Sequence, residues 1–174
     1  MTALTIESTA DDHRIAQLAA LAISLMWLEA SLPSPIPGVK PGLANIVILL
    51  VLRQYGLATA AWVSGLRVIA GSLLLGSFLT PGFVLSCAGA ASSLAVLALV
   101  GRFSARWISL VGISVLAAFA HIGAQLAVVS WWMMPGVNVW ASSPVFATAA
   151  WLGGLVNGVL AEQWLRKVKH VPTT

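Results

Sequence analysis

Long runs of apolar residues fill this chain, and polar or proline-rich stretches interrupt them. A transmembrane α-helix needs about 20 mostly apolar residues, and runs close to that length recur along the sequence. We therefore predict helices over residues 15–32, 43–54, 57–79, 81–100, 107–134 and 145–165. The second of these runs is short, and it spans a membrane only if it is tilted or helped by the preceding loop.

Proline separates the first two predicted helices. The segment SLPSPIPGVKPG, residues 31–42, carries four prolines, which regular helix does not accommodate. It is longer than a minimal turn, so it has the length to fold back into the protein. We predict one all-α transmembrane domain over 15–166, flanked by cytoplasmic tails at 1–14 and 167–174.

Composition identifies the solvent of this domain. Hydrophobic residues make up 59% of the chain and charged residues only 8%, whereas a soluble domain carries about a quarter charged residues. A chain of 174 residues must expose a large share of its side chains, so an apolar exterior implies lipid. The acidic residues Glu7, Asp11 and Asp12 before the first run do not fit a cleaved signal peptide. Cys87 has no second cysteine to pair with and is interpreted as a small buried residue.

Basic residues gather on one side of the predicted helices. That side receives Arg14, Arg53, Arg102, Arg106, Arg166, Lys167 and Lys169. The opposite side receives only Lys40, and Arg67 falls within a helix. The positive-inside rule then predicts both termini in the cytoplasm and an even number of spans, six. The location we expect for such a multi-pass protein is the inner membrane of a bacterium. Topology therefore explains the net charge of +4, and no nucleic-acid partner is implied.

Small residues recur every fourth position on two helices. Ala16, Ala20 and Ser24 follow this spacing on the first helix, and Ala150, Gly154 and Gly158 follow it on the last. Close backbone approach is a main source of helix association in lipid. Packing within the chain is the favoured interpretation, and a docking face for a partner membrane protein is the alternative.

Strongly polar groups inside predicted spans are costly and therefore informative. They are Glu29, Asn45, Arg67, His121, Gln125 and Asn157. His121 and Gln125 lie four apart and share a helix face. With Lys40 in the outer loop, most of this set could line a pocket in the outer half of the membrane. The alternative is structural: Glu29 and Arg67 neutralise each other, while His121 and Gln125 hydrogen-bond between helices.

The charges of the predicted pocket suggest its ligand, and the motifs exclude some chemistry. Lys40 and Arg67 outweigh Glu29 by one, which favours a partly anionic solute, although paired charges also suit a zwitterion or a neutral molecule. The sequence contains no DDxxD, P-loop, HExxH or GxSxG motif, and its three histidines are widely separated. We predict no catalytic residue, metal or cofactor, and no ATP-driven activity of the chain itself.

Two motifs give the chain a family resemblance. The segment EASLPSPIPGVKPGLAN, residues 29–45, together with VGISVLAAFAHIGAQL, residues 111–126, resembles the Gx transporter family, also labelled heptaprenyl diphosphate synthase component I. The likeness covers roughly residues 25–130 and includes LRVIAGSLLLGS and LSCAGAASSL. The family is similar to the S-components of energy-coupling factor (ECF) transporters, which are six-helix bundles that bind a small molecule from outside.

The resemblance implies partners and site residues. An S-component works with a T-component and two ATPases, and its first helix is the usual docking face, which Ala16 and Ala20, with Ser24 at the same spacing, could match. Its marked positions fall on Glu29, Lys40, Asn45, Arg67, His121 and Gln125 of this sequence. The alternative function is a non-catalytic membrane subunit of a prenyl-synthesis or redox complex that holds a lipid, quinone or cofactor. Asp11 and Asp12 alone cannot hold the magnesium that a prenyl diphosphate synthase needs.

Overall fold

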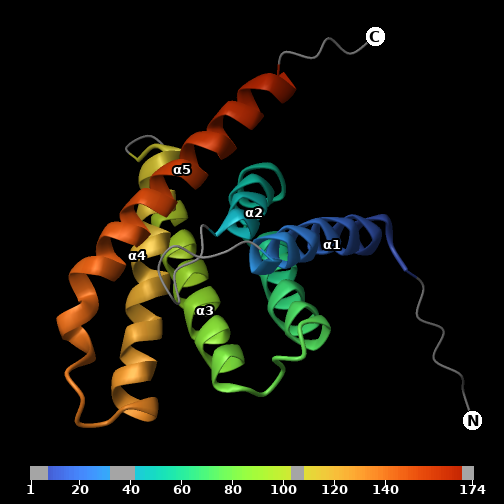
Figure 1. The fold of residues 1–174 in the computed structure, drawn as a ribbon. Coiled ribbons are helices and arrows are strands. Elements are labelled where there is room, and N and C mark those ends of the chain that lie inside the picture. Colours follow the sequence, from blue (N-terminus) through green and yellow to red (C-terminus); the bar gives the residue numbers. More distant parts are fainter. Residues whose placement is uncertain (1–7, 32–41, 103–107, 170–174) are drawn as a thin grey trace, which may run out of the picture.

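The computed structural model describes residues 8–31, 42–102 and 108–169. Its helices are α1 (Ala10–Ser31), α2 (Leu43–Leu74), α3 (Pro81–Arg102), α4 (Leu110–Val128) and α5 (Ser143–Lys169) (Figure 1). A π-helical turn, Val129–Met133, extends α4, and a 3₁₀ turn, Val139–Ser142, precedes α5. The described residues contain no strand, so the all-α prediction is confirmed.

Helix α1 begins five residues before the predicted start, inside the segment predicted as a tail. A reciprocal cap explains this difference. The Thr9 N–H and hydroxyl donate to the Asp12 carboxylate at 2.8 and 2.7 Å, and the Asp12 N–H donates to the Thr9 hydroxyl at 3.2 Å. These bonds satisfy amide groups that the first turn leaves open, and they lower the pKa of Asp12. At the other end of the chain α5 continues to Lys169, so it also enters the predicted tail 167–174.

Helix α2 occupies the region where two helices were predicted, and it breaks at the predicted boundary. Gly56 has φ 86° and ψ −179°, a conformation outside the helical region. The part before Gly56 measures only about 20 Å at 1.5 Å per residue, too short to cross a bilayer. It starts at Gly42, which contacts Asn157 in the middle of α5, and its Arg53 shares a pocket with Arg166 near the end of α5. This part therefore runs along about half the depth of the bundle.

Gly56→Ala is expected to destabilise the protein by about 1–3 kcal/mol, because the observed backbone conformation is essentially restricted to glycine. A Cβ at this position would meet no atom within 4 Å, so backbone strain and not a steric clash causes the loss. Thermal unfolding followed by tryptophan fluorescence measures it. Gly65→Ala is the control, since Gly65 is helical and has equally open space. Equal stability of the two variants would contradict the strain at Gly56.

Two groups of helices form the bundle. Helix α1 lies along α2 from its break onward. The Arg14 guanidinium is 5.1 Å from the ring centre of Tyr55, which directly precedes Gly56, and Met26 lies against Gly71 in the second part. Helix α4 packs against both α3 and α5, and α2 contacts α3 and α5. A Cβ at Gly154 would lie 2.7 Å from Val115 Cα, so α4 and α5 approach at backbone distance. Packing within the chain is therefore confirmed for the small residues of α5.

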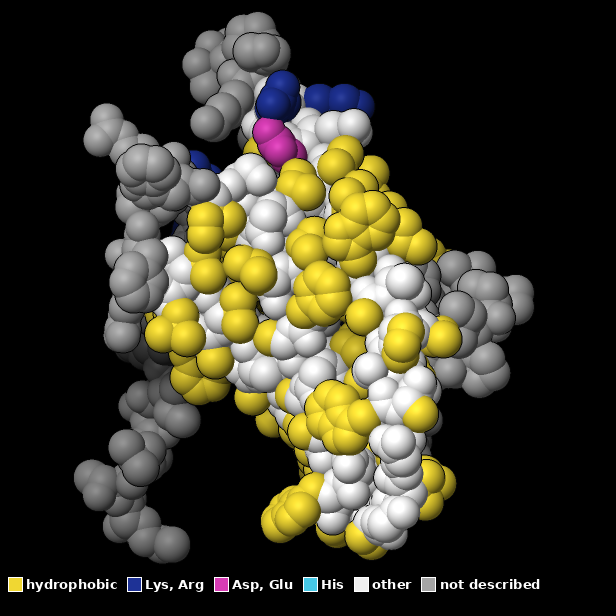
Figure 2. Space-filling model, turned by 90° about the vertical axis from the view of Figure 1, so that its left-hand side faces the viewer, with side chains coloured by type: hydrophobic (Ala, Val, Ile, Leu, Met, Phe, Trp, Pro, Cys, Tyr) yellow, Lys and Arg dark blue, Asp and Glu magenta, His cyan; other side chains and the backbone are white. Residues whose placement is uncertain are grey.

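The exterior is apolar, as a membrane protein requires. Trp151, Leu152 and Trp164 of α5 are each at least half exposed. Figure 2 shows apolar side chains over the face formed by the left side of Figure 1, with the visible charged groups gathered at one end. Within the described residues four helical stretches are long and apolar enough to cross a membrane: Leu43–Leu74, Pro81–Val100, Leu110–Met133 and Val139–Lys167. These four candidate crossings support a multi-pass membrane protein. Helix α1 carries four charged residues and is not one of the four.

Candidate functional site

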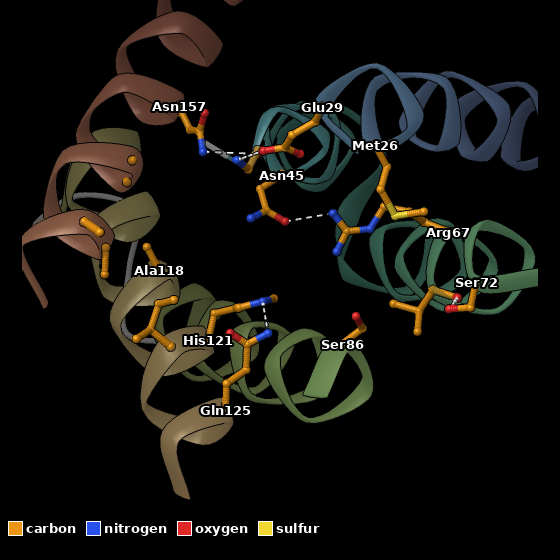
Figure 3. A pocket seen from close by; sticks show the side chains of 17 residues that line it. Met26, Glu29, Asn45, Arg67, Ser72, Ser86, Ala118, His121, Gln125 and Asn157 are labelled. Carbon is orange, nitrogen blue, oxygen red and sulfur yellow. Dashed lines mark hydrogen bonds between the residues drawn. The ribbon is translucent and has the colours of Figure 1, made fainter. Parts of the chain in front are cut away.

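All five helices contribute to one cavity of about 220 Å³. Figure 3 shows side chains converging on it from opposite walls. Its polar and charged lining residues are Glu29, Asn45, Arg67, Ser72, Ser86, His121, Gln125 and Asn157. The cavity is smaller than the roughly 300–1,000 Å³ that drug-sized ligands occupy. It therefore suits a small solute.

Gly42 joins three helices at the first wall of the cavity. Its N–H donates to the Glu29 carboxylate of α1, and its carbonyl accepts a 3.2 Å hydrogen bond from the Asn157 amide of α5. Its φ of 75° lies in the left-handed region, which glycine adopts without steric cost. A Cβ here would also lie 3.1 Å from the Asn45 amide nitrogen. Any other residue at position 42 would therefore strain the backbone and crowd the Asn45 side chain.

Arg67 reaches the cavity from the second part of α2. Its side chain is buried, with 8% of the residue exposed, and its Nη1 donates to Asn45 Oδ1 at 2.9 Å. The Nε of Arg67 is buried and has no hydrogen-bond acceptor. Glu29 is 5% exposed and near enough for its charge to act on Arg67, but the ion pairs formed by described residues do not join these two. The cavity therefore contains two buried opposite charges that lack direct contact.

His121 and Gln125 form the opposite wall through a closed hydrogen-bond network. Gln125 Nε2 donates to the Leu85 carbonyl at 3.3 Å and to His121 Nε2 at 3.2 Å. His121 Nδ1 lies 3.3 Å from the Ser93 hydroxyl, and that hydroxyl donates to the Ala117 carbonyl at 3.0 Å, which favours the ring proton on Nδ1. Both ring nitrogens then have partners within the protein. The Ser93 contact joins α4 to α3 directly, and Gln125 adds a second link through its bond to Leu85. A Cβ at Gly89 would lie 2.5 Å from His121 Nε2, so the ring also needs a glycine beneath it.

The structure brings most of the predicted pocket residues together. Glu29, Asn45, Arg67, His121 and Gln125 line the one cavity, and Lys40 lies outside the described residues. The direct Glu29–Arg67 ion pair, which belonged to the structural alternative, is not among the ion pairs of the described residues. Ala16, Ala20 and Ser24 are exposed on α1 and away from the cavity.

Sequence reasoning did not assign several lining residues to the pocket. Asn157 was recognisable as a polar residue within the last span, but it has no polar neighbour one turn away to suggest a shared face. Ser72, Ser86 and Met26 carry no signal that separates them from ordinary helix residues. Their position in the cavity depends on contacts between distant segments. Small residues of α5, including Ala150 and Gly154, leave the space that the cavity occupies.

The site offers polar recognition, and its donors do not suit a metal. The described residues contain no group of three His, Cys, Asp or Glu side chains arranged to hold a metal ion. Asp11 and Asp12 lie in the first turn of α1 and do not line the cavity. A buried guanidinium, a carboxylate and several amides surround a small volume, so the cavity is suited to binding a small polar molecule.

The comparisons with known proteins give one match. The family model described as heptaprenyl diphosphate synthase component I matches residues 18–164, a segment that includes every residue lining the cavity. No curated protein and no solved structure matches the chain.

Proposed function

The chain belongs to the heptaprenyl diphosphate synthase component I family, and from this premise we propose that it is the substrate-binding subunit of a small-molecule membrane transporter. The observation that carries the proposal is the cavity around Arg67. A buried guanidinium is costly in a membrane protein unless a partner satisfies it, and Arg67 Nε has no acceptor among the described residues. A bound solute with an acidic group would offset the charge of this guanidinium, which lines the cavity. The proposed site residues that the structure describes are Glu29, Asn45, Arg67, His121 and Gln125, and the sixth predicted position, Lys40, lies outside the described residues.

The chain in this proposal sits in a bacterial inner membrane with both termini in the cytoplasm, as a six-segment bundle of S-component type. The segments are α1, the two parts of α2, and α3, α4 and α5. The exposed Arg166 and Lys167 at the end of α5 support this orientation through the positive-inside rule. The solute then enters from the outer side. Single cysteines placed at Val137 and Lys167 in a Cys87→Ser background test it, because only the first should react with an impermeant reagent added outside.

The proposed transport partners are a T-component and two ATPases. The docking face consists of Ala16, Ala20 and Ser24, which are exposed on α1 and small enough to let another helix approach closely. Binding energy at the cavity does not by itself move a solute uphill. An energy-supplying partner is therefore a necessary part of the proposal.

The family description favours a second candidate function. In that function the chain is a non-catalytic membrane subunit of a polyprenyl diphosphate synthesis or redox assembly, and it holds a lipid or quinone. Asp11 and Asp12 do not line the cavity, so catalysis would rest with another component. The cavity volume of about 220 Å³ accommodates only a small part of a heptaprenyl chain, which weighs against a prenyl ligand enclosed there.

Purification of the tagged chain from native membranes in mild detergent tests the two candidates. The transporter function predicts that a T-component and two ATPases co-purify, and that a small polar compound is released on denaturation. A prenyl diphosphate synthase subunit or a redox complex in their place would contradict the transporter function and support the second candidate. Ala20→Leu on the docking face is the matched variant, because it should lose the partners and retain the small compound.

A further inference from the structure

We propose that the ligand of the cavity is a small zwitterion, with its carboxylate at Arg67 and its cationic group at Glu29. This inference rests on the proposed function, because it names the class of solute that the same cavity binds. Its starting point is the pair of buried charges described above. Each is more than nine-tenths buried, both line the cavity, and neither contacts the other directly.

The arginine end is set up for a carboxylate. Nη1 is held by Asn45 Oδ1 at 2.9 Å, which fixes the guanidinium plane, while the buried Nε remains without an acceptor. A guanidinium presents its N–H groups as a planar fork that matches the two oxygens of a carboxylate. Figure 3 shows the Arg67 side chain directed into the space between α2 and α4.

The glutamate end is set up for a cation. Among the described residues Glu29 receives one hydrogen bond, from the Gly42 N–H, and that contact holds the carboxylate at the wall of the cavity. A carboxylate can accept hydrogen bonds at about four lone-pair sites, so a single donor leaves most of these sites available to a ligand. A primary or quaternary ammonium group beside it would offset a buried negative charge that no described cation contacts.

The rest of the lining selects against singly charged molecules. With His121 counted as neutral, the described lining residues carry one positive and one negative charge. A monoanion would satisfy Arg67 but bring a second negative charge toward Glu29, and a monocation would do the reverse. The volume of about 220 Å³ limits the ligand to amino-acid or betaine size.

The test uses the full chain in detergent, with thermal unfolding followed by tryptophan fluorescence. The probes are pools of the standard amino acids, with their N-acetyl derivatives as matched anions and their amides as matched cations, together with glycine betaine, its amide as the matched cation, and inorganic phosphate. At least one zwitterion should raise the Tm, and its singly charged derivatives should need about tenfold or higher concentrations for the same shift. In Glu29→Gln, which retains an oxygen acceptor for the Gly42 N–H, the preference over the N-acetyl derivative should disappear.

Two outcomes would overturn the inference. Only one of them would also contradict the proposed binding function. If the N-acetyl derivatives or phosphate stabilise the wild-type chain as well as any zwitterion, the cavity is an anion site and the proposed binding function stands. If no probe of any charge raises the Tm, the zwitterion assignment and the binding function both fail. The comparison of probes on the wild-type chain holds even if Glu29→Gln does not fold.

Discussion

Arg67→Gln is expected to lower the retention of the co-purifying solute by about 100-fold, which corresponds to about 3 kcal/mol of binding free energy. The substitution removes the charge and the fork of N–H groups, and the shorter glutamine side chain ends near the position of Arg67 Nε, so the bond from Nη1 to Asn45 is also lost. An acidic group of the solute would then be buried without a positive partner. Mass spectrometry of small molecules released from equal amounts of purified wild-type and variant protein measures the effect.

Two further variants make this result interpretable. Arg166→Gln removes an arginine whose side chain is 77% exposed, so it should retain the solute at the wild-type level. If Arg67→Gln lowers folded yield because it leaves Glu29 as an isolated buried charge, the double variant Arg67→Gln, Glu29→Gln should recover the yield without recovering the solute. Full retention of the solute by Arg67→Gln would show that the arginine is only structural.

His121 should behave differently from Arg67, because its two ring nitrogens are already bonded within the protein. Loss of the ring in His121→Ala would remove the direct contact with Ser93 of α3 and leave a gap against Gly89, although Ser93 keeps its bond to the Ala117 carbonyl and Gln125 keeps its bond to the Leu85 carbonyl. We therefore expect this variant to lose folded yield, whereas Arg67→Gln chiefly loses solute. In the sequence Arg67 and His121 were both simply polar residues within predicted spans. Their hydrogen bonds in the structure are what distinguish a binding role for Arg67 from a structural role for His121.

Local patterns in the sequence predicted much of the secondary structure. The length of the apolar runs located the helices, and the weak second run marked the place where α2 breaks at Gly56. The predicted start of α1 was too late, because Thr9 and Asp12 cap the helix within a polar segment that was predicted to be a tail. The number of crossings could not be derived from runs alone, because the first part of α2 covers only about half the bundle depth.

Most of the candidate site was predictable because intramembrane polar residues are rare enough to notice. The free-energy cost of placing a polar side chain in the membrane was enough to select Glu29, Asn45, Arg67, His121 and Gln125 from the sequence. Their contacts were not predictable. The alternative interpretation paired Arg67 with Glu29. In the structure Arg67 bonds to Asn45 and Glu29 accepts from Gly42, and these contacts depend on where the residue preceding α2 meets α5. Asn157 enters the site through that same long-range contact.

Gly158→Leu is expected to destabilise the chain by about 3 kcal/mol or more, or to prevent its accumulation in the membrane. A Cβ at Gly158 would lie 2.6 Å from Val111 Cα and 3.0 Å from Ser114 Cβ. The first of these is backbone, so α4 would have to move away from α5 along its whole packed length. Overpacking a tight contact costs about 1–3 kcal/mol for small additions, and leucine adds a branched side chain. Folded yield and thermal unfolding by tryptophan fluorescence measure the loss.

Gly123→Ala on α4 is the matched control, because a Cβ there meets no atom within 4 Å and alanine favours helix by about 1 kcal/mol over glycine. It should be as stable as the wild-type chain or slightly more stable. Gly158 does not line the cavity, so the milder Gly158→Ala separates packing from binding: its stability should fall while the solute it retains per folded molecule stays unchanged. If Gly158→Leu folds normally but loses a co-purifying membrane protein, α5 makes its close contact with that partner, and the α4–α5 packing described here is not the arrangement in the membrane.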